Sequence, residues 1–184
     1  KVLFLGYGEI GCRCLEHLVD QGMHVIGVVP RASDNDLETK VPSVASVARI
    51  FNIPQIDEGK LRCNDYLSSL KKQSLDYVVS VQYDKILKAN LINTPKEKCL
   101  NLHFSPLPKL RGCYPTKWAI IEENHSGVTF HEIDEGIDTG HLLDQKTTKL
   151  SARETDQTLY LRLSKIANDL FASNLRKIKA RRFP

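Results

Sequence analysis

Short apolar segments alternate with helical patterns along this chain, and that alternation limits the folds it can adopt. Strand-like runs occupy residues 1–5, 24–29, 75–81 and 99–104, and residues 9–21 carry apolar side chains at helical spacing. Strands that alternate with helices predict an α/β protein with a mostly parallel sheet. We therefore expect a Rossmann-like fold in which helices flank a central sheet.

The same signals predict the remaining elements. Helices are expected at residues 41–51 with Pro42 in the first turn, at 65–72 after an Asn64 cap, and at 86–92, and a short strand is expected near Gln55. We also expect a polar loop at 30–40, a proline-rich loop at 105–114, a helix from Pro115, and strands at 128–133 and 142–150. The capping box Ser151–Glu154 predicts the start of a last helix. That helix carries Leu159, Leu163, Ile166 and Leu170 on one face. With no linker or repeat, we expect one domain over residues 1–184.

Composition narrows the class of protein further. The 184 residues are 41% hydrophobic and 26% charged, and no apolar run reaches the roughly 18 residues that a membrane span requires. Five scattered cysteines without CxxC spacing indicate neither a disulfide framework nor a zinc site, so we expect a cytoplasmic protein that needs no metal. A net charge of +4 is compatible with an anionic partner without requiring a nucleic acid.

A glycine motif, Gly6–Gly11, lies between the first strand and the first helix. Its GxGxxG pattern can receive a phosphate on backbone amides at the helix N-terminus, so Gly8 is a candidate contact for a phosphorylated substrate. An NAD site would also need an acid after the second strand, where this chain has Pro30 and Arg31. Arg31 suits a 2′-phosphate, which keeps an NADP oxidoreductase as one hypothesis. A tight turn with no ligand is the other.

Polar residues suited to chemistry follow a later strand. Asn101 and His103 alternate with Leu102, so both are expected on one face at the carboxyl end of that strand. A second loop offers Asp134 and Asp138 among glycines that allow close approach to a ligand. An amide, an imidazole and a carboxylate suffice for acyl transfer to an amine. Taken singly, each residue has an ordinary structural interpretation, such as capping a turn.

Two strings carry a family resemblance: NLHFSPLPKLRG at residues 101–112 and GVTFHEIDEGIDTG at 127–140. They resemble formyltransferases that use 10-formyltetrahydrofolate, namely methionyl-tRNA, glycinamide ribonucleotide and sugar N-formyltransferases. The resemblance runs from the first strand to about Gln145. It implies that Asn101, His103 and Asp138 are catalytic. Pro106 stands where the family usually has Leu, which affects the expected loop shape rather than the chemistry.

The resemblance also implies a folate site. In the family, the segment that corresponds to Tyr83–Leu87 lines the pterin pocket, so Lys85, Ile86 and Leu87 are predicted to bind 10-formyltetrahydrofolate. The loop with Ile133, Asp134 and Gly136 is predicted to form the other wall. Without the resemblance, Ile86 and Leu87 would be interpreted as core residues.

The acceptor is the amine that receives the formyl group. RGCYPTKW at residues 111–118 resembles an element shared by the tRNA and sugar branches, so Arg111 and Tyr114 are predicted acceptor contacts, with a nucleotide-linked amino sugar preferred. Methionyl-tRNA is the alternative that requires a C-terminal region absent from these 184 residues, and glycinamide ribonucleotide is disfavoured by the loop sequence. A noncatalytic anion-binding module and a homodimer both stay open.

Overall fold

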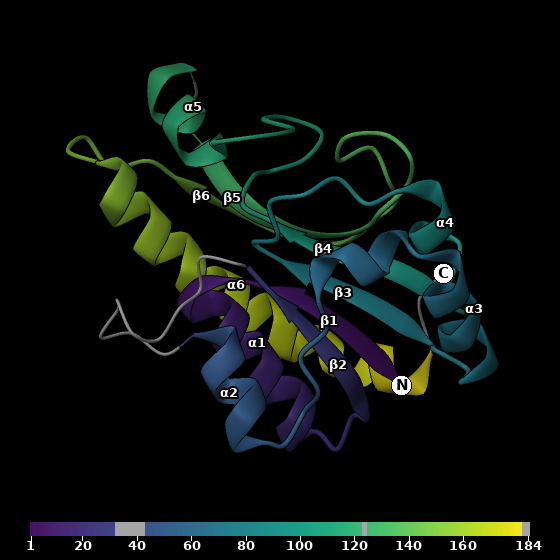
Figure 1. Cartoon of the computed structure of the whole chain (residues 1–184). Helices are drawn as coiled ribbons and strands as arrows, with labels where there is room; N and C mark the ends of the chain where they lie inside the picture. The colour runs from purple at the N-terminus through teal and green to yellow at the C-terminus, as the bar shows by residue number, and fades with distance from the viewer. Residues whose placement is uncertain (32–42, 123–124, 182–184) are drawn as a thin grey trace. The chain divides into compact units, whose positions relative to one another are not determined.

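The computed structural model describes residues 1–31, 43–122 and 125–181. The chain divides into two compact units, Lys1–Leu100 and Asn101–Pro184, which are described one at a time (Figure 1). Strand β4 (Lys98–His103) begins in the first unit and ends in the second. Most of the predicted loop at 30–40, and Pro42, lie outside the described residues. The expectation of one domain stays a prediction.

Parallel strands form the frame of the first unit. Strands β1 (Val2–Gly6), β2 (Val25–Pro30) and β3 (Tyr77–Val81) pair in the order β2-β1-β3, with both neighbours parallel to β1. The segments that join them contain α1 (Gly8–Asp20), α2 (Val44–Ile50), the 3-10 helix Glu58–Arg62 and α3 (Asn64–Lys72), and α4 (Ala89–Ile92) follows β3. Figure 1 shows α1 beside α2, and α3 beside α4. The predicted short strand near Gln55 is a single parallel bridge to Val28.

Strand β1 forms the centre of this unit's core. The four side chains from Val2 to Leu5 are completely buried on both faces of the strand, as expected for a parallel strand covered by helices. Helix α1 buries the predicted apolar face, Ile10, Cys14, Leu15 and Leu18, while the predicted Val19 is only half-buried. Burial of each such large apolar side chain contributes about 1.5–3 kcal/mol.

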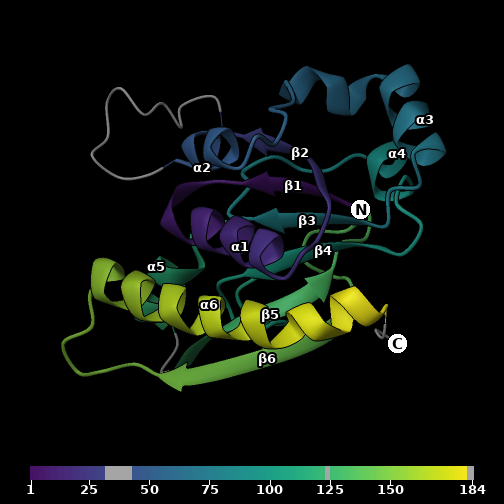
Figure 2. The same ribbon diagram turned by 90° about the horizontal axis from the view of Figure 1, so that it is seen from below.

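The second unit pairs two antiparallel strands with a long helix. Strands β5 (His125–Glu132) and β6 (Leu142–Lys149) are antiparallel, and α5 (Pro115–Glu122) and α6 (Asp156–Ala180) complete the unit. Figure 2 shows α6 running along β5 and β6. Phe130 of β5 contacts Phe171 of α6 edge to face, with ring centroids 5.9 Å apart. The predicted α/β class, with a mostly parallel sheet flanked by helices, is confirmed.

The structure corrects several predicted helix starts. Residues 86–88 are not helical, because α4 begins only at Ala89. Helix α3 begins at Asn64 itself, so the predicted cap is the first helical residue. Helix α2 begins at Val44, where the side chain of Ser43 accepts from the Ser46 amide. Apolar spacing locates the middle of a helix, whereas its start is set by a local capping contact that the apolar spacing does not reveal.

The last helix also starts later than predicted. The predicted box at Ser151–Glu154 precedes it, and the cap is instead Thr155, whose hydroxyl accepts from the Thr158 amide. The Glu154 carboxylate still accepts from the Ser151 amide at 3.2 Å, as the predicted box requires, and it also accepts from the Thr158 hydroxyl and pairs with Arg162. On the buried face of α6, Ala167 and Phe171 lie in the core, whereas the predicted Ile166 is half-buried.

A buried hydroxyl on β5 holds the loop that follows β4. Thr129 Oγ1 donates to the carbonyl of Ser105 at 2.7 Å and accepts from the amide of Leu107 at 3.1 Å. Gln145 of β6 donates through Nε2 to Thr129 Oγ1 at 2.9 Å and to the Leu107 carbonyl at 2.8 Å. These contacts satisfy backbone groups of the loop, which lies outside the strands. The loop therefore has a defined shape with proline at position 106.

Replacing Thr129 by valine keeps the shape of the side chain and removes its hydroxyl. We expect Thr129→Val to lower the free energy of unfolding by about 1–3 kcal/mol, because the Leu107 amide and the Gln145 carboxamide lose a buried acceptor. The matched control is Thr147→Val at an exposed position of β6, expected within about 0.5 kcal/mol of the parent protein. Denaturant unfolding curves measure both variants. Equal losses in the two would contradict the role assigned to Thr129.

Candidate active site

The three residues predicted to be catalytic lie together in the second unit. Asn101 and His103 are at the carboxyl end of β4, while Leu102 between them is buried. Asp138 lies in the loop between β5 and β6. The Nδ1 atom of His103 is 3.6 Å from Asp138 Oδ2, and the two side chains are 10% and 15% exposed. Both groups are thus largely shielded from water, which strengthens their electrostatic interaction.

The hydrogen bond at the other ring nitrogen fixes the proton positions on His103. His103 Nε2 lies 3.1 Å from the carbonyl oxygen of Leu110. Because a carbonyl only accepts, Nε2 carries a proton and donates it. The atom that can take up or release a proton is therefore Nδ1, which faces Asp138. The loop held by Thr129 therefore contacts His103 through the backbone carbonyl of Leu110.

Backbone donors hold Asp138 in place. Its Oδ2 accepts from the amide of Gly112 at 2.8 Å, and its carbonyl accepts from Arg111 Nε at 3.0 Å. Asp138 has a φ of 50°, a conformation that aspartate tolerates better than most residues. The loop closes two residues later at Gly140, where a Cβ would lie 2.0 Å from the Glu132 carbonyl oxygen. Only glycine allows this approach.

His131 is a site residue that the sequence analysis missed. It is 1% exposed on β5, and its Nε2 lies 3.1 Å from Asn101 Nδ2 and 3.6 Å from Asp138 Oδ1. Its ring meets that of His103 edge to face, with centroids 6.2 Å apart. Strand alternation could have found it, because Thr129 and His131 share one face of β5 while Phe130 faces α6.

The predicted folate residues of the second unit form a turn. Ile133 is half-buried, whereas Asp134 and Gly136 are exposed. Asp134 Oδ1 accepts from the Gly136 amide at 3.1 Å and from the Thr139 hydroxyl at 2.6 Å. The carboxylate of Asp134 therefore shapes the loop that carries Asp138.

The predicted folate residues of the first unit lie between β3 and α4. Lys85, Ile86 and Leu87 line a small pocket together with Tyr83. Burial, supported by the negative charges of Glu58 and Asp84, raises the pKa of the Tyr83 phenol to about 12, so this wall presents a neutral hydroxyl. Ile86 is 73% exposed, so its interpretation as a core residue is wrong.

The three residues predicted to contact the acceptor lie in two places. Gly8, with a φ of 66°, is the first residue of α1 at the carboxyl end of β1. Arg111 is exposed and donates through Nε to the Asp138 carbonyl, and Tyr114 is 68% exposed. The Lys117 ammonium lies 4.8 Å from the centroid of the Tyr114 ring.

The arginine that kept the NADP hypothesis open is engaged within the first unit. Arg31 Nε lies 3.0 Å from Asp84 Oδ2, and its guanidinium lies 4.9 Å from the centroid of the Tyr7 ring. A 2′-phosphate would have to replace the carboxylate of Asp84. This pairing weakens the oxidoreductase hypothesis.

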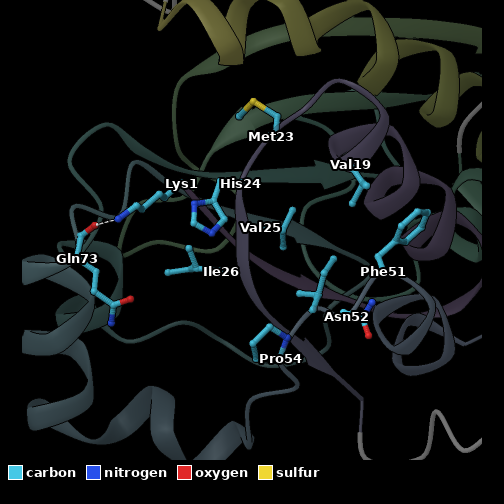
Figure 3. A pocket seen from close by; sticks show the side chains of 11 residues that line it. Lys1, Val19, Met23, His24, Val25, Ile26, Phe51, Asn52, Pro54 and Gln73 are labelled. Atoms are coloured by element: carbon cyan, nitrogen blue, oxygen red, sulfur yellow. Dashed lines mark hydrogen bonds between the residues drawn. The ribbon is translucent and has the colours of Figure 1, made fainter.

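Another pocket of the first unit lies away from these motifs. It has a volume of about 430 Å³ and surrounds the amino ends of β1 and β2, opposite the end of β1 where Gly8 lies. Figure 3 shows the Lys1 side chain reaching the backbone carbonyl of Gln73, at 2.7 Å, across one side of it. Its lining contains none of the predicted site residues.

The described residues contain neither a cluster of metal ligands nor a membrane-spanning helix. Within residues 1–31, 43–122 and 125–181, no three His, Cys, Asp or Glu side chains gather as metal ligands would. None of the helices in the described part of the chain combines the length and apolar character needed to cross a bilayer. All five cysteines are free thiols.

Comparison with known proteins gives a consistent result. A family model described as formyl transferase matches residues 1–175. The methionyl-tRNA formyltransferases of Citrifermentans bemidjiense and Geotalea daltonii are each 33% identical to this chain, over 97% and 98% of its length. The chain spans only 57% and 59% of those relatives.

Several solved formyltransferase structures are similar to this chain. The sugar 3N-formyl transferase WlaRD, determined with dTDP and 5-N-formyl-THF, superposes with a TM-score of 0.82 at 25% identity, covering 100% of this chain and 64% of its own. The Helicobacter canadensis N-formyltransferase, in complex with folinic acid and dTDP-3-aminofucose, superposes with a TM-score of 0.83 at 26% sequence identity. The match covers 100% of this chain and 65% of that protein. Phosphoribosylglycinamide formyltransferase from Bacillus halodurans shares the fold, with a TM-score of 0.76 at 21% identity and 97% and 95% covered. The chain belongs to the formyl transferase family.

Proposed function

We propose that this protein transfers a formyl group from 10-formyltetrahydrofolate to a primary amine. One observation carries the proposal: His103 lies between the Leu110 carbonyl and the Asp138 carboxylate, in the same cluster as the Asn101 carboxamide. These are the groups that acyl transfer to an amine requires, namely an oxyanion donor, a proton carrier and a charge that orients the carrier. Membership of the formyl transferase family supports the same reaction.

The residues of this cluster suit formyl transfer from a folate. 10-Formyltetrahydrofolate supplies the one-carbon unit, and the products are a formamide and tetrahydrofolate. The acceptor nitrogen loses one proton and N10 of the folate gains one, so the protein has to move a single proton and consumes no oxidant or reductant. A titratable imidazole beside a carboxylate suits that task.

Each residue of the cluster has a distinct role in the proposal. The Asn101 carboxamide donates a hydrogen bond to the formyl oxygen while negative charge builds on that oxygen. His103, protonated at Nδ1, adds a second donor and then passes the proton toward the leaving nitrogen. Asp138 stabilises the imidazolium, since its Oδ2 already faces Nδ1. The Gly112 amide keeps the carboxylate oriented.

The folate is assigned to the residues that the family resemblance implies. We assign its binding to Lys85, Ile86 and Leu87 and to Ile133, Asp134 and Gly136. Because the carboxylate of Asp134 is already used by Thr139 and Gly136, the contribution of that loop is assigned to backbone groups. The polyglutamate tail of folate is anionic, which suits a chain of net charge +4.

We propose a nucleotide-linked amino sugar as the acceptor. The two sugar formyltransferases above contain dTDP or dTDP-3-aminofucose and match the whole of this chain, which supports the choice. Arg111 is suited to an anionic diphosphate, and the exposed ring of Tyr114 is suited to stacking. Gly8, at the N-terminus of α1, stays the predicted phosphate contact of the first unit.

Methionyl-tRNA is the second candidate acceptor. It is favoured by the 33% identity to two methionyl-tRNA formyltransferases over nearly the whole of this chain. Phosphate groups and exposed bases would suit the same arginine and tyrosine, so the surface chemistry does not separate the two acceptors.

Replacing Asp138 by asparagine tests the catalytic assignment. Asparagine can still accept from the Gly112 amide, so the loop is retained, but the charge that stabilises the His103 imidazolium is lost. We expect Asp138→Asn to lower kcat by about a hundredfold or more, with KM changed little, as for removal of a group that acts in the transition state. Tetrahydrofolate release measures the rate.

The matched control is Glu135→Gln, which removes one negative charge from an exposed position of the same loop. Its kcat is expected to stay within about twofold of the parent protein, because exposed charges interact weakly. A folded Asp138→Asn variant with near-normal turnover would contradict the assignment of Asp138.

The acceptor is tested by supplying the purified protein with 10-formyltetrahydrofolate and one amine at a time. We expect tetrahydrofolate release with a dTDP-linked amino sugar, and mass spectrometry should show that the sugar gains one formyl group. Charged initiator tRNA and glycinamide ribonucleotide complete the panel, and reactions without an acceptor give the background. Formylation of charged tRNA alone would replace the sugar with the second candidate.

A further inference from the structure

His131 lies in the active-site cluster, yet the proposed mechanism gives it no proton to move. It is 1% exposed, and both of its ring nitrogens are occupied. Thr129, on the same face of β5, holds the loop that carries Leu110 and thereby supports His103. His131 contacts the other polar residue of β4, Asn101.

The two contacts of His131 determine its tautomer. Nδ1 lies 2.6 Å from the carbonyl oxygen of Glu132, and a carbonyl only accepts, so Nδ1 carries the proton. In the neutral ring, Nε2 then has a lone pair. Asn101 Nδ2, at 3.1 Å, donates one of its two protons to that lone pair. The second N–H of the same carboxamide is left for a substrate oxygen.

The surroundings of His131 favour the neutral ring. Burial lowers the pKa of His131, and the positive charge that His103 can carry acts in the same direction. The Glu132 carbonyl and the carboxylates of Asp138 and Asp134 oppose that shift without overcoming it. The distance from Nε2 to Asp138 Oδ1, 3.6 Å, is too long for a hydrogen bond. Asn101 is therefore the hydrogen-bond partner of Nε2.

We propose that His131 is a positioning residue: as the neutral tautomer with its proton on Nδ1, it holds the Asn101 carboxamide with an N–H directed at the formyl oxygen. The inference rests on the proposed function, because it assigns a purpose to the Asn101 donor. It adds a fixed chain of contacts that runs from the Glu132 carbonyl through the imidazole to the carboxamide. Without the acceptor at Nε2, the carboxamide is free to rotate, and its oxygen can face the developing negative charge.

Two substitutions test whether residue 131 must accept a hydrogen bond or only has to fill space. His131→Leu fills the space without an acceptor, and we expect kcat to fall about tenfold or more while KM for folate and amine stays within about threefold. His131→Gln supplies an amide oxygen near the position of Nε2, and kcat is expected to recover to within about threefold of the parent protein. His125→Leu, at an exposed position of the same strand, is the matched control with unchanged kinetics.

A double-mutant cycle tests whether His131 acts through Asn101. In an Asn101→Ala background, adding His131→Leu is expected to lower kcat by less than about twofold, because the group that His131 positions is already gone. Full multiplication of the two losses would overturn the proposal, as would normal kcat in folded His131→Leu. A folded His131→Gln variant as impaired as His131→Leu would also overturn it.

The tautomer can be measured without any turnover. In protein labelled with ¹⁵N-histidine, we expect the His131 ring to show a protonated Nδ1 and an unprotonated Nε2 at pH 6.5, where an unperturbed imidazole is about half protonated. A charged ring, or a proton on Nε2, at that pH would overturn the inference. If the parent protein formylates no amine, the proposed function fails, while this measurement still decides the state of His131.

Discussion

The hydrogen bond from His103 Nε2 to the Leu110 carbonyl is the contact on which the rest of the site depends. It places the exchangeable proton on Nδ1 and turns that atom toward Asp138. The carbonyl can serve this purpose only if the loop after β4 keeps one shape. Thr129 and Gln145 provide that shape by satisfying the buried backbone groups of the loop.

Strand β5 therefore supports both polar residues of β4 through one of its faces. Thr129 acts on His103 through the loop backbone, and His131 contacts Asn101 directly. The opposite face of β5 carries Phe130, which packs on Phe171 of α6. Strand β5 thus contacts the apolar core of the second unit on one face and the active-site cluster on the other. The positions of the site residues therefore depend on core packing.

The predictable parts of the molecule were those with a local physical cause. The apolar run from Val2 to Leu5 and the helical spacing of α1 indicate their structures without any long-range contact. Helix starts were less predictable, because a cap is decided by competition among nearby partners. Residues 151–158 show this: Glu154 accepts from the Ser151 amide as a capping box requires, yet α6 begins only after Thr155, whose hydroxyl accepts from the Thr158 amide.

The sequence by itself determined the α/β class, the pairing of Asn101 with His103 on one face of a strand, and the resemblance that singled out Asp138. Each of these follows from local periodicity or from the residues of one short segment. Only the tertiary structure decided that Leu110 and Asp138 flank His103 and that His131 adjoins Asn101. These partners lie 7 to 35 residues apart in the chain, and hydrogen bonding acts over about 3 Å in space. Folding alone brings such partners together.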